Sequence, residues 1–230
     1  MIRQIIALGG GGFTDDPKNS LLDDYLLKQS PKKTPHICFI GTASGDAKEY
    51  INSFYNCFSN KECNPSHISL FQNNIINLEE HILKQDIIFV GGSNTRNLLV
   101  LWKEWGVDEM LKKAYNQGII LSGVNAGSAC WFDEGLTGTD PENLSKVTCL
   151  SFLKGSNCPL FDSDLNRQIA FKNMIEKGEI KPGIACDYGV AIHFINEKLE
   201  KIVASRKNKH AYQYEMKWML KEMVFEPTHL

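Results

Sequence analysis

The chain has 230 residues, with 25 basic and 27 acidic side chains that give a net charge of −2, and 43% of its residues are hydrophobic. This composition can fill a complete hydrophobic core, which excludes a disordered protein, and the length is typical of one domain. The near-neutral charge balance provides no extended positive surface, so we expect no nucleic-acid partner.

The cysteines and the N-terminus indicate a reducing compartment. The seven cysteines are odd in number and contain no C-x-x-C pair, so we expect reduced thiols, no metal site and no cofactor. The first residues lack the pattern of an export signal, and the longest apolar runs are shorter than the roughly 20 residues that span a bilayer. We therefore predict a cytoplasmic protein with no membrane role.

Short apolar runs alternate with longer amphipathic segments along the chain. The predicted strands are Gln4–Leu8, His36–Ile40, Asp86–Val90, Ile119–Gly123 and Val190–Ile195, with weaker candidates at His67–Phe71 and Leu199–Ala204. The predicted helices are Lys48–Ser59, Thr95–Glu104, Val107–Tyr115 and Asn166–Glu176. This alternation predicts an α/β fold, a doubly wound and mostly parallel sheet with helices on both faces. Because the sequence contains no repeats or low-complexity linkers, we predict a single domain over 1–230.

Two segments have both a functional and a plain structural interpretation. The glycine run Gly9–Gly12 follows the first strand, but it lacks the G-x-G-x-x-G register and a following Lys-Ser/Thr, which favours a tight strand exit over a nucleotide site. The basic segment Lys198–Lys209 contains no interleaved aromatic residues, which favours a solvated hairpin and turn over a nucleic-acid surface.

A second glycine cluster, Gly91–Thr95, lies between the predicted strand Asp86–Val90 and the helix that follows it. The free N–H groups of a helix N-terminus at this edge can stabilise negative charge. Asn94 or Thr95 can also cap the helix, and the two roles are compatible.

The third cluster is Gly123-Val124-Asn125-Ala126-Gly127, which follows a predicted strand and precedes a helix start. Glycines two positions on either side of a central residue are typical of a nucleophile elbow, G-x-S-x-G. The central residue here is Asn125, whose carboxamide is not a nucleophile and has no proton that a base can remove near neutral pH.

Four segments together resemble the peptidase E family, serine peptidases that include α-aspartyl dipeptidase and, more distantly, cyanophycinase. They read VGGSNTRNLL from Val90, GVNAGSACWF from Gly123, LKGSNCPLFDSDLNR from Leu153 and DYGVA from Asp187. The resemblance covers nearly the whole chain. It implies a three-layer α/β/α fold of the flavodoxin-like or class I glutamine amidotransferase-like type.

The resemblance also places the family's triad on this chain. The nucleophile position falls on Asn125, the base position on Leu160, and the acid position on Asp140. It implies an oxyanion hole formed by the backbone N–H groups of Ser93 and Ala126.

The same resemblance implies a substrate-binding set that consists of Gly92, Asn94 and Arg167. Arg167 lies where a guanidinium group can meet a carboxylate. We expect a short peptide or an acidic small molecule as the partner.

Other residues are weaker candidates for the missing groups. Ser128, three residues past Asn125, is the alternative nucleophile, although one helical turn should direct it toward the core. His193 alternates with Ala191 and Ile195 in a predicted strand, which favours a core or edge histidine over a base. Cys158 could supply a thiolate, but a catalytic thiol also needs a base.

Three functional hypotheses follow. The first is a peptidase E-like protein, related to serine-type dipeptidases, that is catalytically impaired and retains a peptide- or acid-binding cleft. The second is an active hydrolase that uses Ser128, or a water held by Asp140. The third is a non-catalytic binding or regulatory protein. The sequence leaves the oligomeric state open.

Overall fold

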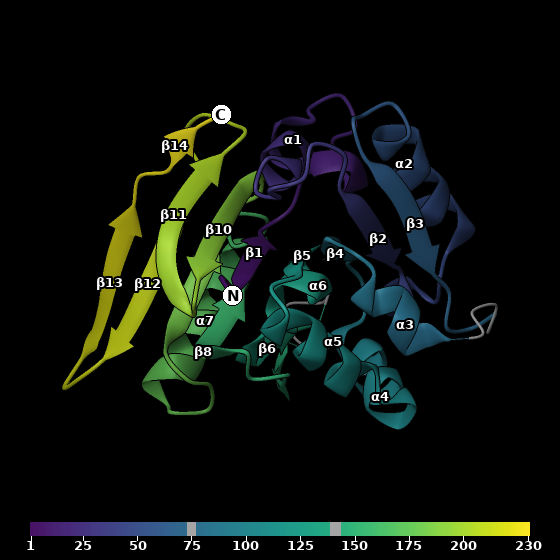
Figure 1. The fold of residues 1–230 in the computed structure, drawn as a ribbon. Helices are drawn as coiled ribbons and strands as arrows, with labels where there is room; N and C mark the ends of the chain where they lie inside the picture. The colour runs from purple at the N-terminus through teal and green to yellow at the C-terminus, as the bar shows by residue number, and fades with distance from the viewer. Residues whose placement is uncertain (73–76, 139–143) are drawn as a thin grey trace.

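A computed structural model describes residues 1–72, 77–138 and 144–230 of the protein. Its larger sheet crosses Figure 1 from β14 to β3 in the order β14-β11-β10-β1-β5-β4-β2-β3. These strands are β1 (Gln4–Leu8), β2 (His36–Ile40), β3 (Asn64–Ile68), β4 (Ile87–Val90), β5 (Ile120–Val124), β10 (Val190–Ile195), β11 (Lys198–Ala204) and β14 (Thr228–His229).

The middle of this sheet is parallel. Strand β1 pairs with β5, β5 with β4, β4 with β2 and β2 with β3, all in parallel register, whereas β10 joins β1 in antiparallel register. The carboxyl ends of β1, β5 and β4 therefore meet at one edge. The predicted α/β fold is confirmed.

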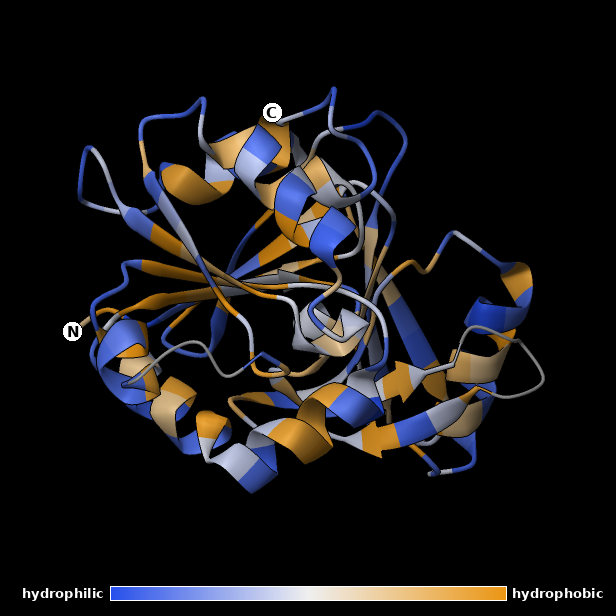
Figure 2. Cartoon of the chain, turned by 90° about the vertical axis from the view of Figure 1, so that its right-hand side faces the viewer, coloured by the Kyte–Doolittle hydropathy of each residue, from blue (hydrophilic) through white to orange (hydrophobic). Residues whose placement is uncertain are grey.

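Helices cover both faces of the sheet (Figure 2), because its strands are apolar on both sides. Ile6 and Leu8 share a core with Phe54, whereas Ile5 and Ala7 share the opposite core with Trp102. The first face carries α1 (Leu21–Leu27) and α2 (Lys48–Phe58). The short 3-10 turns η1 (Gly12–Thr14) and η2 (Thr42–Ser44) lie in the connections. The other face carries α3 (Leu78–Leu83), α4 (Thr95–Trp105) and α5 (Val107–Asn116).

Local sequence explains the bounds of α4. Asn94 precedes the helix and its Oδ1 accepts a hydrogen bond from the N–H of Asn97 at 3.0 Å, so Asn94 is the N-cap of the two candidates, Asn94 and Thr95. Gly106 follows the helix with φ of 70°, a left-handed conformation that glycine adopts without strain. The cap places the first turn of α4 at the carboxyl end of β4.

A second sheet was not predicted. Its order is β13-β12-β9-β8-β6-β7. The strands are β6 (Phe132–Thr137), β7 (Ser145–Thr148), β8 (Leu153–Cys158), β9 (Gly183–Cys186), β12 (Ala211–Met216) and β13 (Leu220–Phe225). Helix α7 (Leu165–Glu176) covers it through Phe171, which packs on Tyr214 with ring centroids 5.7 Å apart. This sheet supplies one wall of the candidate site.

Strand β3 begins and ends earlier than predicted. The N–H of Asn64 donates to the carbonyl of Pro35 at 2.8 Å, which starts the pairing with β2. After Ile68, the carboxylate of Asp46 accepts hydrogen bonds from the Ser69 hydroxyl at 3.0 Å and the Phe71 N–H at 2.9 Å. A side chain thus replaces the strand ladder over residues that the apolar pattern assigned to the strand.

The basic segment Lys198–Lys209 forms β11 and a turn, as the solvated-hairpin interpretation predicted. Among the described helices, none is both long enough and apolar enough to cross a membrane.

Candidate functional site

The candidate site lies at the carboxyl ends of β1, β5 and β4. Leu8, Val124 and Val90 end these adjacent parallel strands, and the loops that follow carry the three glycine clusters. The N–H of Asn125 donates to the carbonyl of Leu8 at 3.4 Å, which ties the loop after β5 to the end of β1. Open α/β sheets place their ligand sites at such an edge.

Asn125 occupies a sharp turn between β5 and the short helix α6 (Ala126–Ala129), with φ of 53° and ψ of −109°. The flanking glycines make the turn sterically possible. A Cβ atom on Gly123 would lie 2.3 Å from the carbonyl oxygen of Gly127, and a Cβ on Gly127 would lie 2.1 Å from that of Val90. The segment therefore has the strained elbow conformation that its glycine spacing predicted.

A cavity of about 520 Å³ opens beside Asn125 and gathers most of the predicted site residues. Six of them line it, namely Ser93, Asn94, Asn125, Ala126, Leu160 and Arg167. Gly92 lines an adjoining hollow of about 400 Å³ that also borders Ser93 and Asn125. Asp140 lies outside the described residues.

Three residues that line this cavity have strained backbone. Ser93, Asn125 and Leu160 have φ values of 127°, 53° and 54°, in a region that residues other than glycine rarely adopt. Each such residue costs about 1–3 kcal/mol, and residues of this kind cluster at active sites and ligand clamps.

Leu160 reaches the cavity from the second sheet, after β8 and Pro159. Its N–H donates to the carbonyl of Gly9 at 2.8 Å, and its carbonyl accepts a hydrogen bond from the Ser163 hydroxyl at 2.7 Å. Its Cδ2 atom lies 2.7 Å from the position of a Cβ on Gly10. The glycine run after β1 thus lets the apolar side chain of Leu160 approach the sheet edge.

Two backbone N–H groups at the cavity are free to bind a ligand. Within the described part of the chain, neither the N–H of Ser93 nor that of Ala126 donates to an acceptor. The neighbouring N–H of Gly92 donates to the Tyr50 hydroxyl at 3.2 Å. The oxyanion hole that the family resemblance implies at these two N–H groups stays a prediction.

Arg167 lines the cavity, but its guanidinium group already has protein partners. Nε donates to the carbonyl of Pro159 at 3.0 Å, Nη1 to that of Gly138 at 3.3 Å, and Nη2 to that of Leu136 at 3.4 Å. Arg167 therefore joins the end of β6 to the turn that carries Leu160 through hydrogen bonds. Its predicted contact with a ligand carboxylate stays a prediction.

The alternative nucleophile lies in the core. The Ser128 side chain is fully buried, donates to Oδ1 of Asn157 at 3.0 Å, and does not line the cavity. Cys158 is also fully buried, and burial raises the pKa of its thiol to about 11. A thiol with this pKa remains protonated at neutral pH.

His193 is a core residue on β10, as the sequence interpretation held. Its Nδ1 lies 2.9 Å from the Tyr25 hydroxyl and its Nε2 lies 2.9 Å from Oε1 of Gln4. Burial lowers the pKa of His193 to about 4, so its ring is neutral at physiological pH. It does not line the cavity beside Asn125.

Sequence reasoning missed the lining residues that the second sheet brings to the cavity. Leu136 and Thr137 come from β6, and Ser145 comes from β7. Arg96, on the first turn of α4, was also missed although it lies inside the segment that carried the family resemblance. The sequence signal for Arg96 was its position three residues after Ser93, which is itself a predicted site residue.

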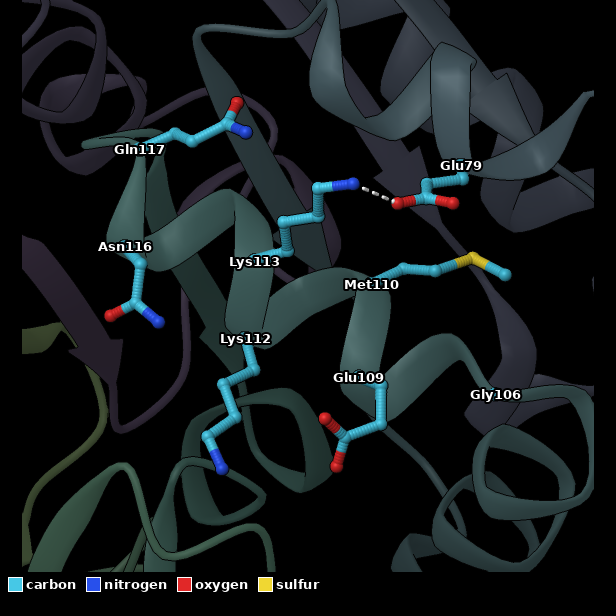
Figure 3. Close-up of a pocket in the computed structure, with 8 residues that line it drawn as sticks. All are labelled: Glu79, Gly106, Glu109, Met110, Lys112, Lys113, Asn116 and Gln117. Atoms are coloured by element: carbon cyan, nitrogen blue, oxygen red, sulfur yellow. Dashed lines mark hydrogen bonds and ion pairs between the residues drawn. The ribbon is translucent and has the colours of Figure 1, made fainter.

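Other hollows contain none of the predicted site residues. One of them, about 760 Å³, lies against α5, where Lys113 forms an ion pair with Glu79 (Figure 3). In residues 1–72, 77–138 and 144–230, no group of three or more His, Cys, Asp or Glu side chains has the arrangement of a metal site.

Comparisons with known proteins agree with this geometry. The profile of peptidase family S51 matches residues 5–202. The chain is 46% identical over 215 residues to the uncharacterized peptidase YgaJ of Bacillus subtilis (strain 168), which covers 94% of this chain and 93% of that protein.

Two solved structures share the fold. A putative peptidase E protein from Listeria monocytogenes EGD-e matches with a TM-score of 0.63 and 16% identity, over 87% of this chain and 98% of the other. A peptidase from an acI-B1 actinobacterium matches with a TM-score of 0.73 and 13% identity, over 99% and 95%. With the family profile and the Bacillus relative, these similarities show that the chain belongs to the peptidase E family, peptidase family S51.

Proposed function

We propose that this peptidase E family protein has a degenerate catalytic triad, binds a short peptide or an acidic small molecule in the cleft beside Asn125, and hydrolyses peptides slowly or not at all. Asn125 occupies the nucleophile position and Leu160 the base position. The protein acts in the cytoplasm, where its buried thiols stay reduced, and cell fractionation tests this location.

The composition of the cavity wall carries the proposal. Asn125 and Leu160 line the same cavity, and the described lining residues contain no histidine, cysteine, aspartate or glutamate. A serine hydroxyl is a weak nucleophile unless an adjacent base removes its proton. The hydroxyl groups that line this cavity therefore lack a described partner that can activate them.

The expected loss of catalytic turnover is large. Removing the serine or the histidine of such a triad typically lowers turnover by a factor on the order of 10⁴–10⁶, and removing both costs little more because they act as a unit. Hydrolysis by the family mechanism should therefore be close to background.

Retention of the binding cleft has separate support. The strained conformation of Asn125 persists although the residue is not a nucleophile, and the free N–H groups of Ser93 and Ala126 still border the cavity. A polypeptide backbone at this edge can place a carbonyl oxygen against these two donors.

The two alternative functions gain less support. A displaced nucleophile at Ser128 is disfavoured because its hydroxyl is fully buried and hydrogen-bonded to Asn157. A non-catalytic regulatory protein would differ from the protein that we propose only in the ligand that occupies the cleft, so binding measurements distinguish the two hypotheses.

The test restores the two missing groups together. Calorimetry should detect binding of L-aspartyl-L-leucine to the natural protein, and its hydrolysis should be at background. Asn125→Ser combined with Leu160→His should then produce measurable turnover, whereas each single substitution should stay near background because neither completes a nucleophile and base pair.

Two outcomes would contradict the proposal. Turnover by the natural protein that disappears on Ser128→Ala would establish a displaced nucleophile. If no short peptide or dicarboxylic acid tested binds, the proposed role of the cleft in binding such ligands is wrong.

A further inference from the structure

Arg96 is an exposed cation that lines the cavity beside Asn125. It lies on the first turn of α4 and lines the cavity together with Ser145 of β7. Nη2 donates to the Ser145 hydroxyl at 3.1 Å and to the carbonyl of Lys146 at 2.9 Å. The backbone of Arg96 belongs to α4 and both acceptors belong to β7, so these two bonds hold the side chain between the two elements.

Much of the Arg96 guanidinium remains available to a ligand. In the part of the chain that the structure describes, Nε and Nη1 of Arg96 donate to no acceptor. At Arg167, by contrast, all three nitrogens already donate to backbone carbonyls. Arg96 is therefore the better placed of the two cations to bind an incoming anion.

The charge around Arg96 favours the same ligand. The described lining of the cavity includes two cations, Arg96 and Arg167. The N-terminus of α4, an 11-residue helix, adds the positive end of its dipole at the same wall. Hydrogen bonds from arginine to a carboxylate are shorter and about twice as strong as neutral ones.

We propose that Arg96 forms an anion-binding subsite of the cleft, which takes a carboxylate of the bound peptide or acid. The inference rests on the proposed function, since it assumes that the cleft binds such a ligand. Arg167 then positions the Leu160 turn, and Arg96 selects the ligand by its charge.

Three dipeptides locate the carboxylate that Arg96 binds. L-Aspartyl-L-leucine carries a side-chain and a C-terminal carboxylate, L-asparaginyl-L-leucine lacks the first, and L-aspartyl-L-leucine amide lacks the second. Calorimetry with the natural protein should show that one of these two neutral replacements weakens binding about tenfold or more.

The same replacement should have less than a twofold effect in Arg96→Gln, because the charge that recognised the carboxylate is gone. Arg96→Lys should keep part of the discrimination. Lys103→Gln is the matched control, since Lys103 lies on the same helix, carries the same charge and does not line this cavity. It should bind all three peptides as the natural protein does.

The outcomes separate the two proposals. If no dipeptide binds the natural protein, the proposed function fails and this inference fails with it. If the peptides bind and Arg96→Gln weakens all three equally, or none of them, the cleft stands and Arg96 does not recognise the anion. Selective loss for one carboxylate supports the subsite and identifies that carboxylate.

Discussion

The hydroxyl of Ser128 donates a hydrogen bond to Oδ1 of Asn157 at 3.0 Å, and both side chains are fully buried. Asn157 in turn donates from Nδ2 to the carbonyl of Ile184 at 3.2 Å. The serine thus joins α6 to β8 and β9 of the second sheet, and its environment is that of a structural core residue.

Ser128→Ala should therefore lower stability without changing any hydrolysis. Loss of the donor leaves the buried Asn157 oxygen without its partner, at about 1–2 kcal/mol. Urea unfolding measures the loss. The control is Ser53→Ala at a half-buried position, which removes only an exposed bond to a helix carbonyl and should cost less than about 0.5 kcal/mol. Labelling of the natural protein by a fluorophosphonate that Ser128→Ala abolishes would contradict this role.

His193 should destabilise the protein in acid. Its pKa is lowered to about 4 by burial, from an ordinary value of 6.5, so the folded state disfavours the charged ring. The stability contribution of the neutral ring is fully present above pH 6.5 and is lost as pH falls toward 4. Between pH 7.5 and 4.5 the loss should be about 2–3 kcal/mol.

His193→Gln isolates this contribution, because the glutamine does not titrate. Urea unfolding at both pH values should show a smaller acid loss in the variant than in the natural protein. An equal acid loss in the two proteins would show that His193 is already charged, or exposed, in the folded state.

Asp23 should have the opposite effect on the pH dependence of stability. Its carboxyl is 1% exposed, neither oxygen has a partner among the described residues, and burial raises its pKa to about 7. The folded state therefore favours the protonated acid, so the contribution of Asp23 to stability is fully present below pH 3.8 and is lost as pH rises toward 7.

Asp23→Asn should remove this loss and stabilise the protein at pH 8 by about 2–4 kcal/mol, with little change at pH 3.5. Thermal unfolding at both pH values provides the measurement. Glu104→Gln, an exposed acid on α4, should change stability little at either pH. Destabilisation by Asp23→Asn at pH 8 would mean that the ionised carboxylate has a stabilising partner.

Gly127 should tolerate no side chain. A Cβ there would lie 2.1 Å from the carbonyl oxygen of Val90, a backbone atom that cannot move without displacing β4. Gly127→Ala should therefore cost about 3 kcal/mol or more, or prevent folding. Gly178→Ala is the control, since Gly178 has φ of 70° with no atom within 4 Å of its Cβ position, and should cost about 1 kcal/mol.

Urea unfolding compares the two alanine variants, and soluble yield serves if Gly127→Ala does not fold. Equal and small losses at both positions would mean that the elbow can relax away from β4, and that its strain is not imposed by close packing.

The sequence by itself determined the middle of the parallel sheet, the covering helices α2, α4 and α5, and the elbow at Asn125, whereas it did not predict the covering helices α1 and α3. Strands such as Ile87–Val90 are buried on both faces, so their apolar runs appear locally, and the glycines around Asn125 are required by contacts within one turn. The amphipathic pattern of Thr95–Trp105 and its cap are local for the same reason.

Only the tertiary structure decided what surrounds Asn125. Ser145–Thr148 and Gly183–Cys186 are as short as Ile87–Val90 but lack its continuous run of large apolar side chains, so pairing with strands elsewhere in the chain decides them. Whether an arginine faces a ligand or a backbone carbonyl also depends on such distant partners, which is why Arg167 was chosen from the sequence and Arg96 was found in the fold.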